Sequence, residues 1–353
     1  MALEAANNFS FLRLLLASLV LLSHAPELID GNRGRELFTL LTHQMSFGEL
    51  AVDGFFVISG FLVTKSWVQK PGLLAFLDKR VRRIYPGFIV SCILSALVVG
   101  PLAAASSAYF SQFNYYELLM TTLRLQVPLT PPVFPGHSYA FVNGSLWTIS
   151  YEALCYLIVA AFGLLGMFRR RALWPLFLAG CFAIWVNLNT TLFLHPLSAF
   201  LAANSFPEVF RFLSYFFAGT CFYLFHSKIR YFKFGAAIAA VALYLSVTDA
   251  TWFQLTLMAC GSYLLFAFAF AQIPVLKSFQ KAPDISYGVY LYGWPTQKLL
   301  IQFIPGISPW ILFPASLLIC CGLGLLSWHL VEKHFMRKRK QIQRNPNPAL
   351  ALV

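Results

Sequence analysis

Six ionisable side chains lie inside long apolar stretches of the sequence: Arg13, His24, Asp53, Lys65, Glu152 and Lys298. Charge in a segment apolar enough to cross a membrane is costly, so each such group is a candidate functional residue. A histidine titrates near neutral pH and is the usual general base for removing a proton from a hydroxyl. A carboxylate on its second ring nitrogen would fix the tautomer and stabilise the protonated ring. His24 is therefore the candidate base, and Asp53 and Glu152 are the candidate carboxylates.

The spacing of these residues along the chain suggests where they lie in a membrane. Arg13 and His24 are eleven residues apart in one apolar stretch. That is close to three helical turns, which places both on one helix face, about 16 Å apart along the axis. Asp53 and Glu152 lie near the starts of two other apolar stretches. If successive stretches cross in alternating directions, His24, Asp53 and Glu152 reach a similar depth on the outer side, which predicts one shared site.

Structural roles remain open for each of these residues. His24 is also compatible with a place at the membrane interface, and Asp53 with capping the start of a helix. Glu152 is also compatible with a structural ion pair within the bundle, although it lies further inside its stretch than Asp53 does. Lys65 and Lys298 have long stems that allow their amines to reach an interface.

A basic cluster at Lys79–Arg83 points to a second kind of chemistry. Arg80 and Arg83 are one helical turn apart and share a face. The planar guanidinium group binds phosphate through paired hydrogen bonds, so these two residues are candidate phosphate ligands. The same cluster also fits a contact with anionic lipid headgroups beside a membrane span.

The composition requires that these residues be held by membrane helices. Of the 353 residues, 59% are hydrophobic and only 11% are charged, against about 25% charged in a soluble domain. Disordered chains are poor in apolar residues, so disorder is excluded. A helix needs about 20 apolar residues to cross a bilayer. We predict an all-α bundle of about ten transmembrane helices, near residues 9–25, 49–69, 86–106, 146–168, 172–189, 209–226, 234–249, 252–273, 284–304 and 309–330.

Basic residues set the predicted orientation of this bundle. With the N-terminus in the cytoplasm, nineteen Lys and Arg residues fall inside: Lys70, Lys79, Arg80, Arg82, Arg83, Arg169, Arg170, Arg171, Lys228, Arg230, Lys233, Lys277, Lys281, Lys333, Arg337, Lys338, Arg339, Lys340 and Arg344. Only four fall outside: Arg33, Arg35, Arg124 and Arg211. This bias is typical of cytoplasmic loops, so both termini are predicted to be cytoplasmic. It also explains the net charge of +13 without a nucleic-acid partner.

We expect one membrane-embedded domain at residues 1–340 and a cytoplasmic tail at 341–353. The seven cysteines all lie in apolar stretches and show no C-x-x-C spacing, so no metal site is predicted.

Several separated segments, in order along the chain, resemble the acyltransferase-3 family of membrane acyltransferases. They are Arg13 and His24 in FLRLLLASLVLLSHA, AVDGFFVISGFLVTKSW at Ala51–Trp67, RVRRIYP at Arg80–Pro86, GSLWTISYE at Gly144–Glu152, ISYGVYLYGWP at Ile285–Pro295, and the closing SWHLVEKHF. The resemblance covers most of the chain.

The resemblance implies an enzyme of the bacterial inner membrane that takes an acyl group, usually acetyl, from acyl-CoA. The usual acceptor is a sugar hydroxyl of an envelope or secreted glycan, or a lipid-linked sugar. Acyl-CoA is then a cosubstrate, with no cofactor bound permanently. The residue matching His24 is expected to be catalytic, and those matching Arg13, Arg80 and Arg83 are expected to handle CoA. The residue matching Glu152 is a recurring motif residue.

Two positions depart from the family pattern. Gly293 stands where many members have histidine, and Ala153 where many have a second glutamate. The segment Ser107–Asn143 contains four prolines and is expected to lie over the outer mouth of the site. A polytopic carrier or glycan exporter without acyl-transfer chemistry remains the alternative function, because intramembrane charges also serve transport.

Overall fold

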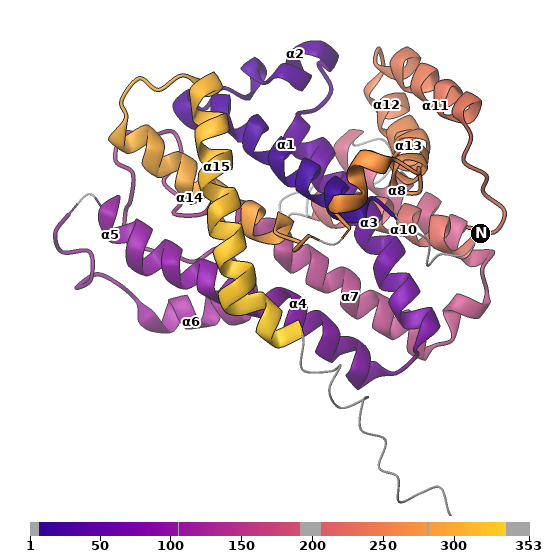
Figure 1. Ribbon diagram of the computed structural model, residues 1–353, viewed down its shortest axis with the longest axis horizontal. Coiled ribbons are helices and arrows are strands. Elements are labelled where there is room, and N and C mark those ends of the chain that lie inside the picture. The colour runs from indigo at the N-terminus through magenta and orange to yellow at the C-terminus, as the bar shows by residue number, and fades with distance from the viewer. Residues whose placement is uncertain (1–6, 105, 191–205, 281, 337–353) are drawn as a thin grey trace, which may run out of the picture.

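The computed structural model describes residues 7–104, 106–190, 206–280 and 282–336, and its regular elements in these ranges are helices (Figure 1). The predicted tail at 341–353 lies outside the described residues. The main helices are α1 (Phe9–Asp30), α2 (Leu37–Thr42), α3 (Phe47–Gln69), α4 (Leu73–Leu94), α5 (Gly100–Leu102), α6 (Tyr115–Leu123), α7 (Thr148–Leu164), α8 (Leu173–Thr190), α10 (Phe206–Leu224), α11 (Lys233–Ser246), α12 (Ala250–Thr256), α13 (Ser262–Ala269), α14 (Ser286–Phe303) and α15 (Pro309–Ser327). The predicted all-α architecture is confirmed.

Six helical segments are long and apolar enough to cross a membrane: Phe9–Asp30, Phe47–Gln69, Leu73–Leu102, Gly144–Leu164, Ala250–Ala269 and Pro309–Met336. The other four predicted stretches also form helices, but they fall short by length or hydropathy. α8 and α11 contribute only shorter apolar segments. α10 carries Glu208 and Arg211, and α14 carries Gln297 and Lys298. Ten crossings and the orientation of the termini therefore remain predictions.

The polar helices α10 and α14 lie in the interior of the bundle, where lipid does not select for apolar side chains. Most residues of both helices are buried. α10 packs so closely on α3 that a Cβ atom at Gly60 would lie 1.9 Å from the carbonyl oxygen of Phe216. A Cβ atom at Gly219 would lie 2.0 Å from the carbonyl oxygen of Val57. Small residues allow this backbone contact, as in many membrane bundles.

α1 and α3 run antiparallel, and their contacts give a scale of depth for the site. The ring of Phe9 packs against Phe61 at a centroid distance of 5.9 Å. Farther along α1, Leu16 packs on Gly54. Near the other end of the pair, Ser23 packs on Gly48. A capping box, formed by the side chains of Ser46 and Glu49, fixes where α3 begins.

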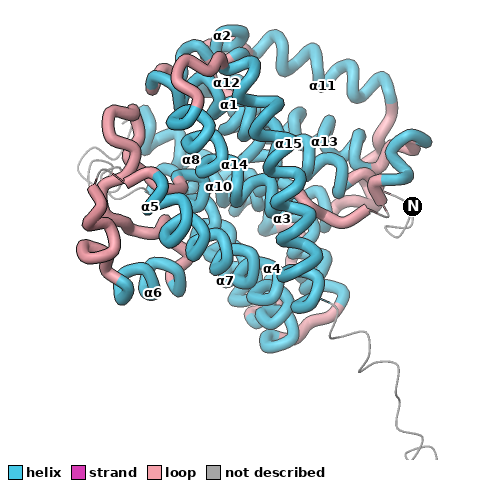
Figure 2. The backbone as a smooth tube through the Cα atoms, turned by 60° about the vertical axis from the view of Figure 1, so that its left-hand side comes forward, coloured by secondary structure: helices cyan, strands magenta, loops and turns pink. Residues whose placement is uncertain are grey.

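The segment between α4 and α7 has two parts, which pack against different helices. Its helix α6 lies along α4, where the Tyr85 hydroxyl donates to the carbonyl oxygen of Leu123 at 2.9 Å. Its later part covers α14: the Lys298 amine, fully buried, lies 4.6 Å from the ring centre of Phe134. Figure 2 shows the loops of this segment beside α5 and α6. This later part also contacts two neighbours of His24, because Tyr139 donates to Glu27 and packs on Trp294. Its place over an outer mouth stays a prediction.

Candidate active site

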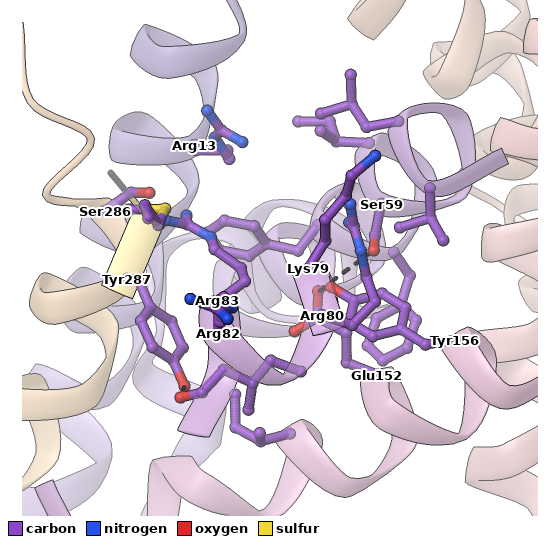
Figure 3. A pocket seen from close by; sticks show the side chains of 18 of the residues that line it. Arg13, Ser59, Lys79, Arg80, Arg82, Arg83, Glu152, Tyr156, Ser286 and Tyr287 are labelled. Carbon is purple, nitrogen blue, oxygen red and sulfur yellow. Dashed lines mark hydrogen bonds between the residues drawn. The ribbon is translucent and has the colours of Figure 1, made fainter. Parts of the chain in front are cut away.

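A cavity of about 810 Å³ lies between α1, α3, α4, α7 and α14 (Figure 3). Its cationic lining residues are Arg13, Lys79, Arg80, Arg82 and Arg83. Along α3 the lining extends from Val63 to Val52, which is about 16 Å at the rise of an α-helix. The end near Val52 is lined by Phe55, Thr148 and Tyr290. The cavity thus joins a basic region to a largely apolar channel.

Arg13 and Arg83 are held by one buried carboxylate. Asp284, just before α14, accepts from Arg83 at 2.7 Å and pairs with Arg13 at 3.1 Å. Burial alone would raise the pKa of Asp284, but Arg83 and Arg13 lower it to about 2. Glu332 lies 3.8 Å from the other side of Arg83. Asp284 therefore stays ionised and joins α1 to α4.

Arg80 has a different environment from Arg83. Its guanidinium lies 5.5 Å from the ring centres of both Phe76 and Tyr156. It donates to the Ser66 hydroxyl at 3.3 Å, while its buried Nε has no hydrogen-bond partner. Within the described part of the chain no carboxylate pairs with Arg80, so its charge is available to an anion in the cavity.

Glu152 lies in the cavity and its carboxylate faces α3. It accepts hydrogen bonds from the Ser59 hydroxyl at 3.2 Å and the Tyr156 hydroxyl at 2.5 Å. Figure 3 shows Arg13 and Arg83 on one side of the cavity and Arg80, Glu152 and Tyr156 on the other. Ser59 lies two residues from Phe61, which packs on Phe9. Glu152 is therefore level with the first turns of α1, near Arg13.

Asp53 is buried between α3 and α10. Its carboxylate accepts from Arg211 at 3.0 Å, and both side chains are at most 10% exposed. Glu208 and Glu49 lie 3.5 and 3.9 Å from the same guanidinium. The Asp53–Arg211 pair thus joins the two helices that pack most closely. Neither Asp53 nor Glu152 contacts His24, in contrast to the shared site that we expected.

The carboxylate beside His24 is Glu27, which sequence reasoning missed. The Nδ1 atom of His24 lies 3.1 Å from Oε2 of Glu27. Glu27 is 3% exposed and also accepts from the Tyr139 hydroxyl at 2.7 Å and from Nε of Arg33 at 2.5 Å. The three-residue spacing from His24 was a usable signal. It was overlooked because Glu27 lies beyond the predicted apolar stretch, whereas α1 continues to Asp30.

Tyr290 of α14 lines the cavity, and Trp294 of the same helix packs on His24. We call this pair of aromatic residues the partition. The Tyr290 hydroxyl donates to the Ser145 carbonyl at 2.6 Å and lies 2.5 Å from the Thr148 hydroxyl. One turn farther, Trp294 packs edge-on against His24 with centroids 5.0 Å apart. From Tyr290 to Trp294 is four residues, or about 6 Å along the helix.

The contacts between α1 and α3 give the same distance between the end of the cavity and His24. The lining residue Val52 lies four residues from Gly48, which packs on Ser23 beside His24. Four residues of α-helix again span about 6 Å. The apolar end of the cavity therefore stops roughly one helical turn short of His24.

The departure at Gly293 has a steric explanation. A Cβ atom at this position would lie 2.5 Å from the side chain of Leu21 on α1. A histidine side chain would therefore require Leu21 to move. In this chain Leu21 fills that space, and His24 one turn later is the histidine that meets α14.

The sequence matches one protein-family profile and, over nearly its whole length, two known proteins. The sequence profile of the Acyltransferase domain matches residues 7–329. The chain is 30% identical, over 95% of its length, to the "O-acetyl transferase" of Shigella phage Sf6, 98% of which is covered. It is 28% identical, over 95% of its length, to "Nodulation protein 10" of Rhizobium leguminosarum bv. viciae, 95% of which is covered. No solved structure matches.

Proposed function

Because the chain belongs to the acyltransferase-3 family, which makes it a membrane acyltransferase, we propose that it is an O-acetyltransferase of the bacterial inner membrane. It takes an acetyl group from acetyl-CoA and passes it to a sugar hydroxyl of an envelope or secreted glycan. The observation that carries this proposal is the cavity, which is basic at one end and runs about 16 Å along α3 toward His24.

This shape suits acyl-CoA, which carries phosphates at one end and a thioester at the end of a long arm. The phosphates bind at the basic end, where Arg80 has no carboxylate partner among the described residues. Arg13 and Arg83, fixed by Asp284, extend the positive surface. The arm then lies in the channel beside α3. Glu152 lines this channel near Ser59.

The acceptor approaches from the opposite side of the partition. The His24 side chain is 17% exposed, so its ring is reachable from outside the cavity. Nε2 of His24 takes the proton of the acceptor hydroxyl, whose oxygen attacks the thioester carbonyl carbon. The carbon–sulfur bond breaks, and the CoA thiolate takes up the proton from His24. An ester and free CoA result, and the partition must open for the thioester to reach His24.

The predicted topology completes the proposal. With both termini cytoplasmic, the basic end of the cavity opens toward the side where CoA is found. His24 then faces the outer side, where glycans are assembled. The relative named O-acetyl transferase supports acetyl as the group transferred.

Ester analysis in the native host tests the proposal. A deletion strain is complemented with the wild type, His24→Ala, or the control His226→Ala, at matched membrane expression. His226 is suited as the control because its ring contacts the carbonyl oxygen of Tyr223, in the last turn of α10, at 2.6 Å and does not line the cavity. NMR of the envelope and secreted polysaccharides, before and after mild base, reports O-acetyl groups.

We expect an O-acetyl signal that disappears on deletion and returns with the wild type and His226→Ala only. General-base catalysis contributes roughly 10²–10⁴-fold, so His24→Ala should restore almost none. Full restoration by His24→Ala would remove His24 from the mechanism. If no ester changes in any strain, transport of a glycan becomes the better explanation.

A further inference from the structure

We infer that Glu27 is the positioning residue of His24, and that Tyr139 and Arg33 hold Glu27 in place for this role. The inference rests on the proposed function, because it assigns a role in the same reaction. It is carried by three hydrogen bonds that meet at one buried carboxylate: from His24 at 3.1 Å, Tyr139 at 2.7 Å and Arg33 at 2.5 Å.

The burial of Glu27 requires that its charge be balanced by protein groups and not by water. The side chain is 3% exposed at the last turn of α1, and a buried carboxylate is tolerated only when it is paired and hydrogen-bonded. The two oxygens of the Glu27 carboxylate have different partners. Oε1 receives the bonds from Tyr139 and Arg33, and Oε2 faces His24. Two partners therefore orient the carboxylate, and the second oxygen is left for the imidazole.

The geometry determines which nitrogen of His24 acts as the base. An ionised carboxylate only accepts hydrogen bonds, so Nδ1 must carry the proton in the Glu27 contact. The lone pair is then on Nε2, which is the atom that receives the acceptor proton. When His24 becomes positively charged during the reaction, the negative charge of Glu27 stabilises it.

The partners of Glu27 come from different parts of the outer surface. Arg33 follows α1 directly and its side chain is 62% exposed. Tyr139 belongs to the long segment before α7, and its ring also packs against Trp294 at 5.6 Å. Tyr139 thus touches both the carboxylate that orients His24 and the residue that separates His24 from the cavity. The position of this segment is thereby coupled to the position of the base.

Purified protein in nanodiscs tests the inference. The variants are Glu27→Gln, which keeps the shape and removes the charge, Glu27→Asp, which keeps the charge, and Tyr139→Phe, which removes one bond to the carboxylate. The control is Arg35→Gln, whose residue pairs with Asp30 on the exposed surface nearby. Turnover is measured as CoA release from acetyl-CoA, with the glycan and lipid extract of the deletion strain as acceptor. Thermal unfolding is followed in the same samples.

Glu27→Gln should lower kcat by about 10²-fold, within the range of a general-base contribution, while KM for acetyl-CoA and Tm stay near the wild type. Glu27→Asp should recover part of kcat, and Tyr139→Phe should lower it several-fold. Arg35→Gln should match the wild type. A structural role would instead lower Tm and would not separate kcat from KM.

Two results separate the inference from the proposed function. If the wild type turns over and His24→Ala does not, but Glu27→Gln and Tyr139→Phe keep wild-type kcat, Glu27 is not a positioning residue and the proposed function stands. If Glu27→Gln unfolds, the inference is decided by Tyr139→Phe, because wild-type kcat in that variant overturns it. If the wild type releases no CoA with the extract, the proposed function itself fails.

Discussion

The indole of Trp294 lies edge-on against the imidazole of His24, with ring centroids 5.0 Å apart and an interplanar angle of 79°. On its other side Trp294 packs on Gly144, where a Cβ atom would lie 2.7 Å from the indole. Its Nε1 donates to the carbonyl oxygen of Phe141 at 3.3 Å. The indole is therefore fixed between His24 and the turn that precedes α7. It lies one helical turn beyond Tyr290, which lines the cavity.

Truncation of this side chain should make the enzyme hydrolyse its donor. In Trp294→Ala the space left by the indole connects the cavity to His24, so water can replace the acceptor. We expect acetyl-CoA hydrolysis without acceptor to rise roughly tenfold, a part of what a general base contributes. The measurement is CoA release by the purified protein. Adding His24→Ala to the same chain should abolish the increase.

A matched control for this change is Trp174→Ala. Trp174 is fully buried on α8 among Phe168, Phe177 and Phe217, and it does not line the cavity. Its truncation costs about 3–5 kcal/mol of stability, as expected for a buried Trp. Equal acetyl-CoA hydrolysis in both variants would show that the increase comes from looser packing in general and not from the loss of Trp294 in the partition.

Arg80 and Arg83 should respond differently to replacement. Arg80 has no carboxylate partner in the described residues, whereas Arg83 contacts Asp284 and Glu332. Arg80→Ala should raise KM for acetyl-CoA roughly 10- to 100-fold, equivalent to about 1.5–3 kcal/mol for a charged hydrogen bond. Its Tm should change little. Arg83→Ala should lower Tm, because Asp284 then keeps only Arg13 and Glu332 loses the arginine that it contacts.

Steady-state kinetics on acetyl-CoA, together with thermal unfolding, separates these effects. Arg82→Ala provides the comparison, since Arg82 also lines the cavity but pairs at 2.6 Å with Asp78 on the same helix. We expect Arg82→Ala to have the smaller effect on KM. The assignment of Arg80 as the main phosphate ligand is wrong if Arg80→Ala binds acetyl-CoA as tightly as the wild type.

We expect Asp53 to contribute to the stability of the fold and not to catalysis. Asp53→Asn leaves the buried Arg211 without its strongest partner, which costs about 3–5 kcal/mol when a buried pair is broken. Asp53→Leu combined with Arg211→Met removes both charges and should recover most of the loss, since apolar replacement of such a pair is often neutral. Thermal unfolding in detergent measures both. An inactive Asp53→Asn protein with wild-type Tm would instead favour the catalytic role predicted from the sequence.

The positions of the helices could largely be predicted from the sequence, because a helix that crosses a membrane needs a long apolar stretch. All ten predicted stretches form helices, and six of them belong to helical segments that are both long and apolar enough to cross a membrane. α14 was placed by its pattern even though its buried residues include Gln297 and Lys298. Its interior position, next to α1 and α15, could not be inferred from hydropathy, because hydropathy describes contact with lipid and not with protein.

Which carboxylate lies beside His24 could not be predicted from the position of each carboxylate along its own apolar stretch. Glu152 was expected beside His24 because it follows the start of its span. In the structure the turn Gly144–Trp147 before α7 is itself tucked into the bundle, with Ser145 and Leu146 buried. α7 therefore begins deep, and Glu152 reaches Ser59. Such an offset between neighbouring helices depends on tertiary packing, which the order of residues in one stretch does not encode.

Two glycines at the α3–α10 contact give the sharpest stability prediction. Gly60→Ala would put a methyl group 1.9 Å from a backbone oxygen, and Gly219→Ala one at 2.0 Å. Backbone cannot rotate away as a side chain does, so the helices must separate and loosen the Asp53–Arg211 pair between them. We expect each variant to lose about 3 kcal/mol or more, at or above the upper end of ordinary overpacking.

Gly322→Ala is the matched control, because Gly322 also lies in a long helix, α15, with nothing within 4 Å of the added methyl. Alanine in a helix interior is favoured over glycine by roughly 0.5–1 kcal/mol. Its Tm should therefore stay level or rise, while that of Gly60→Ala and Gly219→Ala falls. Wild-type Tm in Gly60→Ala would mean that α3 and α10 are farther apart than the structure places them, and the Asp53–Arg211 contact would have to be reconsidered with it.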